Sequence, residues 1–440
     1  MTDTTRVVVI GAGIAGVSTV YHLQRNGIRD VVLVDPRPAL TLTSDKSTEC
    51  YRNWWPSKPM VGLMQRSIDL LEEVARETDN AIGLSRRGYL FVTGSEDTLN
   101  AMRSQAYQIS ELGAGDVREH PGAVAYGDAY DGVDILDPSE LAKHFPYLTP
   151  EAVGAVHVRR AGWFSAQQLG AWMLQEAKAA GVRPLKAEVT AIEVEGGRVQ
   201  SVSLDDGSVI NCDAVVVAAG PMAAGVAGMA GVDLPLFSEL HLKVAYRDHL
   251  GVIPRNAPMI IWSDPQHIDW SDDEREGLTE LGRDDLLGEM PVFCHGRPEG
   301  GKESPYFVAL WEYHREILEP TWPLPDDPLY PEAVMRGLTT MVPGLNAYLD
   351  GLPESSVDGG YYTKTSENRP LIGPCGPEGV HVVAGLSGFG VMASSAAGDL
   401  VARHLAGASL PDYADAFLLS RYDDPAYSAS IETETSSGQL

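Results

Sequence analysis

Near its start the chain has an apolar run that leads into glycines. Residues 6–10 (RVVVI) are almost entirely apolar, which predicts a buried strand, and residues 11–16 (GAGIAG) follow directly. Helical spacing of apolar positions over residues 17–26 predicts a helix that Gly27 ends. Residues 31–35 (VVLVD) predict a second buried strand whose last residue is an acid. This order of strand, turn, helix and strand is typical of a parallel α/β domain.

Patterns of the same kind return twice further along the chain. Residues 167–180 have helical spacing and end at Gly181, and residues 212–219 (CDAVVVAA) predict a buried strand. The last return joins a strand at residues 380–385 (VHVVAG) to a predicted helix over residues 393–405. We therefore expect three separated stretches of the chain to build one domain.

The segments that separate these three stretches have a different pattern. Their short runs rich in aromatic and β-branched residues predict half-buried strands. They are residues 88–92 (GYLFV) and, within residues 235–341, the segments LHLKVAYR, PMIIWS, MPVFCH and YFVALWEYH. The acidic stretch at residues 269–289 predicts a solvated loop with a short helix. These segments together predict a second domain built on a largely antiparallel sheet.

The fold class that follows is α/β, and α+β overall: a Rossmann-type domain joined to a second domain with a mainly antiparallel sheet. A chain of 440 residues agrees with two domains, because it exceeds what one hydrophobic core usually supports. We expect the first domain to take residues 1–85, 150–232 and 350–423, and the second to take residues 86–149 and 233–349. Residues 424–440 are polar and rich in Ser, Thr and Glu, which predicts a flexible tail.

The composition excludes several classes of function. With 33 Lys and Arg against 61 Asp and Glu, the formal charge is −28, which disfavours nucleic acid and anionic membranes as partners. No run of about 20 apolar residues predicts a membrane span. The four cysteines form no CxxC pair, and no HExxH or similar spacing indicates a metal site. We therefore expect reduced thiols, no metal and a cytoplasmic location.

The spacing Gly11-x-Gly13-x-x-Gly16 between a strand and a helix is that of a dinucleotide-binding turn. The first glycine permits the tight turn, the second lets the backbone approach a pyrophosphate, and the third allows close packing of the helix. The helix N-terminus then offers unpaired N–H groups to the phosphates. Asp35 lies nineteen residues beyond Gly16, where its carboxylate can accept a hydrogen bond from a ribose 2′-OH. The combination predicts a bound dinucleotide.

Four segments give the chain a family resemblance. They are the glycine turn with its flanking strands, AVVVAAGP near residue 217, YYTKTSENRPLIG at residues 361–373 and VVAGLSGFGVMASSAAG at residues 382–398. In this order they resemble the D-amino-acid oxidase superfamily of FAD enzymes, which includes sarcosine oxidase, glycine oxidase and dimethylglycine dehydrogenase. The resemblance implies FAD as the cofactor, and it implies that a helix from Ala393 directs its N-terminus at the flavin, where it stabilises negative charge on the reduced ring.

The resemblance also implies which residues contact FAD. We expect these to be Gly11, Gly13, Ile14, Ala15, Gly16, Asp35, Pro36, Arg37, Ser44, Lys46, Ser47, Val189, Ala219, Gly220, Gly385, Gly388, Phe389, Gly390 and Val391. The cysteine that binds flavin covalently in monomeric sarcosine oxidases is replaced here by Gly360. The histidine that does so in dimethylglycine dehydrogenases has no counterpart in residues 43–47 (TSDKS). We therefore expect FAD to be bound without a covalent link.

Within such a superfamily the C–H bond next to a substrate nitrogen is broken by hydride transfer to flavin, so the protein mainly positions the substrate and excludes water. The catalytic candidates are Lys46, Arg52, Lys243 and Lys364. Arg52 has the planar fork that suits a substrate carboxylate, and a cation such as Lys46 near the ring can favour oxygen reduction.

Further candidates come from the second domain, which supplies the weaker ones, and from the segment beside the flavin edge. They are His295 and Arg297, expected just past a strand end, Glu312, Tyr313 and His314, expected within a strand, and Arg369. The neighbouring Trp54 and Trp55 are expected in the core rather than at the cofactor.

The sequence therefore predicts an FAD-dependent oxidoreductase that oxidises the C–N bond of an amine or amino acid, with O2 as the expected acceptor and H2O2 as a product. Three alternatives stay open: a dehydrogenase that passes electrons to a flavoprotein or quinone, an FAD-binding subunit of a larger assembly, and a hydroxy-acid oxidase. The substrate and the oligomeric state are not indicated by the sequence.

Overall fold

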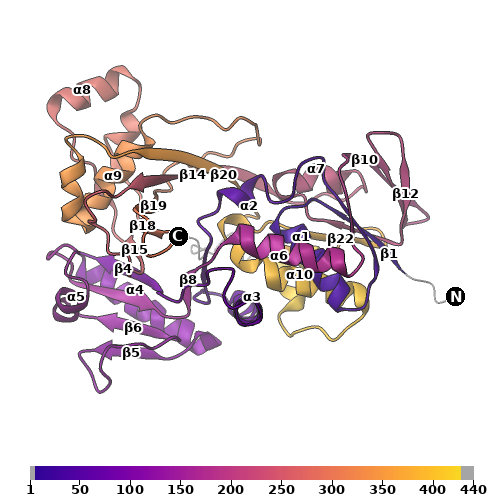
Figure 1. The fold of residues 1–440 in the computed structure, drawn as a ribbon, viewed down its shortest axis with the longest axis horizontal. Coiled ribbons are helices and arrows are strands. Elements are labelled where there is room, and N and C mark those ends of the chain that lie inside the picture. The colour runs from indigo at the N-terminus through magenta and orange to yellow at the C-terminus, as the bar shows by residue number, and fades with distance from the viewer. Residues whose placement is uncertain (1–4, 428–440) are drawn as a thin grey trace.

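The computed structural model describes residues 5–427, which form two joined halves, each built on one large sheet (Figure 1). The first half contains a six-stranded sheet in which all neighbouring strands are parallel except β21 and β22. In spatial order its strands are β21 (Leu371–Pro374), β22 (Val380–Ala384), β13 (Ala214–Val217), β1 (Arg6–Ile10), β2 (Asp30–Val34) and β9 (Arg183–Leu185).

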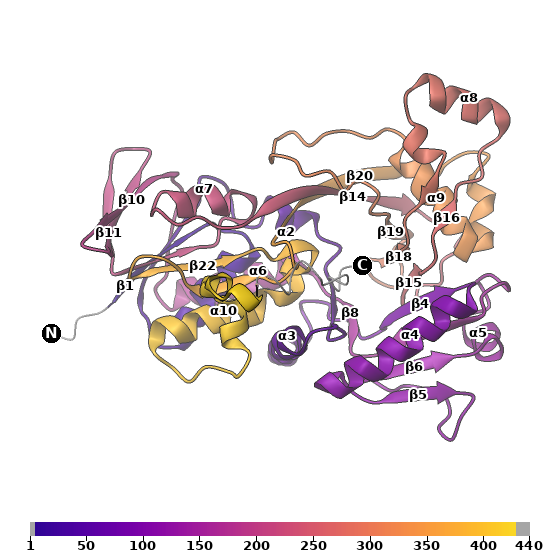
Figure 2. The same cartoon turned by 180° about the vertical axis from the view of Figure 1, so that it is seen from behind.

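Alternate side chains of this sheet enter two different cores. In β1, Val7 and Val9 pack with helices, whereas Val8 and Ile10 pack with a small β-meander and α7. The helices on the first face are α1 (Ile14–Arg25), α3 (Lys58–Glu77), α6 (Ala166–Ala179) and α10 (Gly390–Ala406). Figure 2 shows the last three of them from behind. The second face is covered by β10 (Val189–Glu195), β11 (Arg198–Leu204), β12 (Val209–Asn211) and α7 (Ala223–Gly228).

The second half contains a nine-stranded sheet that is antiparallel except at two pairs, β15 with β4 and β5 with β6. In spatial order its strands are β20 (Ser355–Lys364), β14 (Phe237–Arg247), β19 (Tyr306–Leu310), β18 (Cys294–Glu299), β15 (Met259–Trp262), β4 (Tyr89–Thr93), β7 (Gly154–Val158), β6 (Val133–Leu136) and β5 (Val117–His120). Helix α9 (Tyr330–Met341) covers one face of this sheet, and its aliphatic residues share a core with alternate residues of β14 and β15.

Smaller elements join or decorate the two halves. Strand β3 (Cys50–Arg52) pairs with β8 (Ala161–Trp163), and β16 (Gln266–His267) pairs with β17 (Glu289–Met290). The remaining α-helices are α2 (Thr43–Lys46), α4 (Glu96–Ile109), α5 (Pro138–His144) and α8 (Asp272–Glu280). Helix α8 lies in the acidic stretch, as predicted, and a capping box from Ser271 and Glu274 begins it. Among residues 5–427, no helix combines the length and the apolar character that crossing a membrane requires.

Several predicted elements differ from those observed. Helix α10 begins at Gly390 rather than at 393, because a short 3-10 turn over Ser387–Phe389 leads directly into it. His295 and Arg297 lie inside β18 rather than past its end. Residues 311–314 are not in a strand: β19 ends at Leu310, after which the N–H of Tyr313 turns back to the carbonyl of Trp311.

Two strands also belong to a different sheet from the one that the expected domain bounds gave them. Strands β7 and β20 belong to the nine-stranded sheet, although we expected residues 150–232 and 350–423 in the other half. Of the predicted flexible tail, residues 428–440 lie outside the described residues. Tyr427 is held in place, since its hydroxyl donates to Glu367 at 3.0 Å and accepts from Arg369 at 3.1 Å.

Close packing of α1 against α10 gives a test of the fold. A Cβ atom at Gly398 of α10 would lie 2.7 Å from the backbone carbonyl carbon of Ser18 in α1. We expect Gly398→Ala to destabilise the protein by about 1–3 kcal/mol, since neither backbone can yield without unpacking its neighbours. Gly228→Ala, where the added atom meets nothing within 4 Å, is the matched control and should leave the midpoint of thermal unfolding unchanged or slightly raised. Equal midpoints for the two variants would contradict this packing.

Candidate active site

The glycine turn between β1 and α1 has the geometry expected of it. Gly11 has a φ of +107°, and a Cβ atom there would lie 2.8 Å from the carbonyl carbon of Ala218. A Cβ atom at Gly16 would run into the carbonyl oxygen of Gly11. Only glycine therefore allows this turn and the close approach of α1 to it.

Hydrogen bonds order the turn and leave donors at the start of α1. Asp35 accepts the N–H of Ala12 at 2.9 Å, and Ser44 Oγ accepts the N–H of Ile14 at 3.0 Å. Within residues 5–427, the N–H groups of Gly13 and Ala15 donate to no protein acceptor. A helix N-terminus with such donors is suited to a phosphate group. The turn therefore fits the pyrophosphate of FAD.

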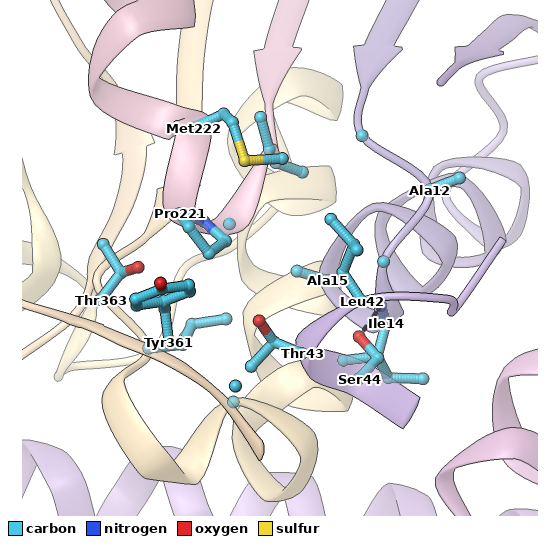
Figure 3. A pocket seen from close by; sticks show the side chains of 18 of the residues that line it. Ala12, Ile14, Ala15, Leu42, Thr43, Ser44, Pro221, Met222, Tyr361 and Thr363 are labelled. Atoms are coloured by element: carbon cyan, nitrogen blue, oxygen red, sulfur yellow. Dashed lines mark hydrogen bonds between the residues drawn. The ribbon is translucent and has the colours of Figure 1, made fainter. Parts of the chain in front are cut away.

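A cavity of about 480 Å³ begins at this turn and extends to β20 and the start of α10. Figure 3 shows it bordered by Ile14 and Ser44 on one side, by Tyr361 and Thr363 of β20 on another, and by Pro221 near β13. Every residue predicted to contact FAD lines this cavity except Gly16, which packs against Gly11, and Phe389, which lines a second cavity. Contact with FAD itself stays a prediction.

The far end of this cavity is formed by the turn before α10 and by Tyr362. A Cβ atom at Gly388 would collide with the ring of Tyr362, so glycine is needed there to make room for this side chain. The ring of Tyr362 in turn stacks on His241, with centroids 3.9 Å apart. Gly360, at the position of the cysteine in the resembling enzymes, faces Thr43, whose Cα would lie 3.3 Å from an added Cβ. Little space is left for a larger side chain at this position.

One face of the nine-stranded sheet supplies the wall between the two halves. Directly opposed residues of an antiparallel pair point to the same side. His295 of β18 is opposed to Leu310 of β19 and to Ile261 of β15, which places its side chain on the same face as Leu310. On β14, His241 and Lys243 are two residues apart, and both line the large cavity. The wall facing the cavities therefore carries polar groups at alternate positions.

A second, smaller cavity of about 50 Å³ lies against this wall. Thr48, Leu310, Tyr362 and Gly388 line both cavities, so the two adjoin. The other residues that line the small cavity are Cys50, Arg52, Trp55, Tyr89, Met259, His295, Glu312, Phe389 and Met392. This small space lies beside the predicted flavin end, and its lining combines apolar side chains with Arg52, His295 and Glu312.

Arg52 is the cation of the small cavity and is only 6% exposed. Its Nε donates to the carbonyl of Trp54 at 3.2 Å, and its guanidinium lies over the ring of Trp55, 4.6 Å from the centroid. Burial lowers the pKa of Arg52 from its usual value, although a guanidinium remains charged at neutral pH. Trp54 and Trp55 are core residues as expected, and Trp55 is also a wall of the small cavity.

Two carboxylates flank the imidazole ring of His241. Glu312 lies 3.5 Å from His241 Nδ1, and Glu239 lies 3.1 Å from His241 Nε2. Burial alone would lower the pKa of His241, but the two carboxylates outweigh it and raise the pKa. Lys364 pairs with Glu239 at 2.5 Å and lines neither cavity. The catalytic role predicted for Lys364 therefore has no support in its position.

Two other cations hold the chain between the cavities. Lys243 Nζ donates to the carbonyl of Ser47 at 2.9 Å, and Arg297 Nη2 donates to the carbonyl of Thr48 at 2.6 Å. Burial lowers the pKa of Lys243. Lys46 lines the large cavity too, but it is paired with Asp45 at 2.7 Å and Asp358 at 2.9 Å, and these bonds raise its pKa.

Three of the further candidates lie away from both cavities. Tyr313 and His314 bind Asp327, at 3.1 Å and 3.0 Å respectively, and Arg369 donates to Tyr427. The four cysteines are buried and free, and burial raises the pKa of Cys50 beside Arg52. Residues 5–427 contain no group of three or more His, Cys, Asp or Glu side chains that could hold a metal ion.

Sequence reasoning missed several residues of the site, notably Thr48, Tyr89, His241, Met259 and Tyr362. A signal for some of them was present, because Glu239, His241 and Lys243 are polar at every second position of an otherwise buried strand. For Tyr89 and Met259 no such signal existed, since buried aromatic and thioether side chains are ordinary core residues.

Comparisons with known proteins agree with this architecture. The DAO family, described as FAD dependent oxidoreductase, matches residues 6–404. Mitochondrial sarcosine dehydrogenase of Mus musculus is 27% identical over 255 residues, which are 55% of this chain and 25% of that protein. Sarcosine oxidase subunit beta of Rhodobacter capsulatus is 25% identical over 242 residues, which are 53% of each chain. The chain thus covers between a quarter and about half of these relatives' length.

A solved structure gives the fold independently. The L-proline dehydrogenase of P. horikoshii superposes with a TM-score of 0.74 at 20% identity, covering 96% of this chain and 99% of that chain. This likeness confirms the predicted fold class, and the family match confirms the predicted resemblance and the cofactor, FAD. The chain belongs to the family of FAD-dependent oxidoreductases.

Proposed function

We propose that this protein oxidises the C–N bond of an amine or amino acid that carries a carboxylate, giving an imine that water hydrolyses. The observation that carries the proposal is Arg52, a buried guanidinium in a cavity of about 50 Å³ next to the expected flavin end of the large cavity. A buried guanidinium favours a carboxylate, which it can bind through two parallel hydrogen bonds. The names of the relatives, sarcosine dehydrogenase and sarcosine oxidase subunit beta, agree with such a substrate.

When bound, the FAD that this family uses would supply the acceptor for a hydride from the carbon next to the substrate nitrogen. The residues that would hold it are those of the glycine turn, with Gly13 and Ala15 offering N–H groups and Asp35 offering its carboxylate to the ribose. Ser44, Gly360 and Gly388 line the remaining length of the cavity. Because Gly360 provides no side chain for a bond, we propose that FAD is held without a covalent link.

The other groups around the small cavity are uncharged or apolar, which favours a dry site. Burial raises the pKa of Cys50, of Tyr89 and of Tyr362, so each keeps its proton at neutral pH. Trp55, Phe389 and Met392 complete the wall with apolar surface. Exclusion of water strengthens the attraction between Arg52 and a carboxylate and protects the C–H bond cleavage from competing reactions.

For the electron acceptor we propose O2, with Lys243 rather than Lys46 as the cation that assists. Lys243 lines the large cavity and its Nζ donates to a neutral carbonyl, so its positive charge is not cancelled by that bond. Lys46 is paired with two carboxylates. A dehydrogenase is the second candidate, favoured by the sequence similarity to sarcosine dehydrogenase.

Asp35 gives a test of cofactor binding. We expect Asp35→Asn to weaken FAD binding about 10-fold to 100-fold, because a charged acceptor contributes about 1.5–3 kcal/mol to such hydrogen bonds. The measurement is fluorescence titration of apoprotein with FAD. Asp30→Asn, at the other end of β2 and paired with Arg6, is the matched control and should bind FAD normally. Acid precipitation of the wild-type protein should release all the yellow colour, and colour kept by the pellet would contradict non-covalent binding.

Arg52 gives the test of the reaction. Under anaerobic conditions, sarcosine or L-proline should bleach the flavin of the purified protein, and Arg52→Met should raise the concentration for half-maximal bleaching rate about 10-fold to 100-fold. Arg103→Met, on the exposed face of α4, should behave as the wild type. Bleaching by lactate but by no amine would instead identify a hydroxy-acid oxidase, and no bleaching by either class would contradict the proposal.

The acceptor is tested by admitting air after bleaching. We expect rapid return of the oxidised spectrum with formation of H2O2, and a return at least 10-fold slower in Lys243→Met, because the transient negative charge on oxygen loses its nearby cation. Lys178→Met, exposed on α6, is the control. Slow return in the wild type, with fast return on adding an artificial quinone, would favour the dehydrogenase. A slow return in Lys46→Met with a normal one in Lys243→Met would reverse the assignment of the cation.

A further inference from the structure

His295 lies at the wall of the small cavity, and a hydrogen bond fixes the tautomer of its neutral ring. Its Nδ1 is 2.7 Å from the carbonyl oxygen of Phe293, and a carbonyl can only accept, so Nδ1 carries the hydrogen. The ring is 3% exposed and lines the same space as Arg52. In a neutral ring this leaves the lone pair on Nε2, the nitrogen that makes no hydrogen bond with another group among residues 5–427.

The backbone is strained where it provides this hydrogen bond. Phe293 has a φ of +71°, in the left-handed region that a bulky side chain rarely adopts. Its N–H donates to the carbonyl of Trp262 at 2.8 Å while its own carbonyl receives His295 Nδ1. Strain of this kind persists only where the surrounding structure imposes it, and it is concentrated at functional sites. The carbonyl that fixes the tautomer of His295 therefore belongs to a residue in an unfavourable backbone conformation.

The groups around His295 keep its ring neutral at rest and include one carboxylate that can balance a proton gained there. The titratable and charged groups on the elements packed around it are Cys50 and Arg52 of β3, Tyr89 of β4, Tyr362 of β20, His241 of β14, and Glu312 after β19. Burial lowers the pKa of His295, which keeps the ring neutral before substrate binds, and Arg52 acts in the same direction. Glu312 opposes both, since its carboxylate favours the charged ring.

Amines and amino acids in water near pH 7 carry an ammonium group, and hydride loss from the adjacent carbon requires the nitrogen lone pair. We propose, resting on the proposed function, that His295 is the catalytic residue that accepts the ammonium proton of the substrate, while Arg52 holds the carboxylate. One N–H bond of the ammonium breaks and its electron pair stays on nitrogen. A new N–H bond forms at Nε2, and no electron leaves the substrate in this step.

Glu312 is the positioning residue of this step. The imidazolium formed at His295 is buried, so it needs a counter-charge to be stable. Glu312 is held for this by its contact with His241, and this contact outweighs burial and keeps the pKa of Glu312 below its usual value. His241 is not placed for this role, because it lines the large cavity rather than the small one, and the two carboxylates that raise its pKa favour a ring that already carries the proton.

The experiment is anaerobic reduction of the flavin by sarcosine or L-proline in stopped flow, from pH 6 to pH 10.5, with holoprotein throughout. The wild-type rate should vary little above pH 7. His295→Gln should be about 100-fold slower at pH 7, as is typical for loss of a general base, and should recover as the pH approaches the pKa of the free amine. Glu312→Gln should show the same trend with a smaller deficit, and it provides the test if His295→Gln does not retain FAD.

His249→Gln, exposed in the turn after β14, is the matched control and should follow the wild type. A His295→Gln rate that is lowered by one factor at every pH, with no recovery, would show a merely structural role and overturn the proposal. A normal rate would overturn it as well. Wild-type protein that neither amine reduces at any pH would overturn the proposed function, and this inference with it, so the two failures are distinguishable.

Discussion

The site depends on two cations of the nine-stranded sheet that bind backbone carbonyls of the other half. Lys243 binds the carbonyl of Ser47 and Arg297 binds that of Thr48. Thr48 lines both cavities, so these bonds set the position of the wall that the cavities share. Without these carbonyls as acceptors, burial of the two cations would cost free energy. Without the two cations as donors, the chain just before β3 would not be held at a fixed distance from the nine-stranded sheet. The same two hydrogen bonds therefore satisfy the buried cations and fix the chain at the boundary between the halves.

The two cavities that adjoin at this boundary differ in the groups that line them. On one side, glycines and N–H groups near α1 form a long cavity whose charged lining residues are Asp35, Arg37, Lys46, Glu188 and Lys243. On the other side, the small cavity holds Arg52 and Glu312, one of each sign, with His295 beside them. Opposite charges in a space of about 50 Å³ agree with the proposed amino-acid substrate. A zwitterion can meet both groups, whereas a simple amine or a simple acid can meet only one of them.

The sequence predicted the cofactor half well and the substrate half only in outline. The glycine spacing around Gly11 and the acid at Asp35 are short-range features whose geometry follows from backbone sterics, so they could be placed from the sequence. The small cavity depends on pairing between distant strands: β18 brings His295 beside Leu310, and β3 brings Arg52 to the same space. Strand order across nine strands is not encoded in any local pattern. This is why Lys364 was expected at the site, whereas the structure pairs it with Glu239 outside the cavities.

The central claim is that FAD lies in the large cavity with an amino acid between its ring and Arg52. A crystal structure of the holoprotein with 2-aminoisobutyrate tests it most directly, because this amino acid has no hydrogen on its α-carbon and cannot be oxidised. The account predicts a flavin that reaches from the turn at Gly11 to Gly388, a carboxylate on Arg52, and a nitrogen within hydrogen-bond distance of His295 Nε2. An amino acid bound outside the small cavity, or a flavin ring remote from Gly388, would contradict it.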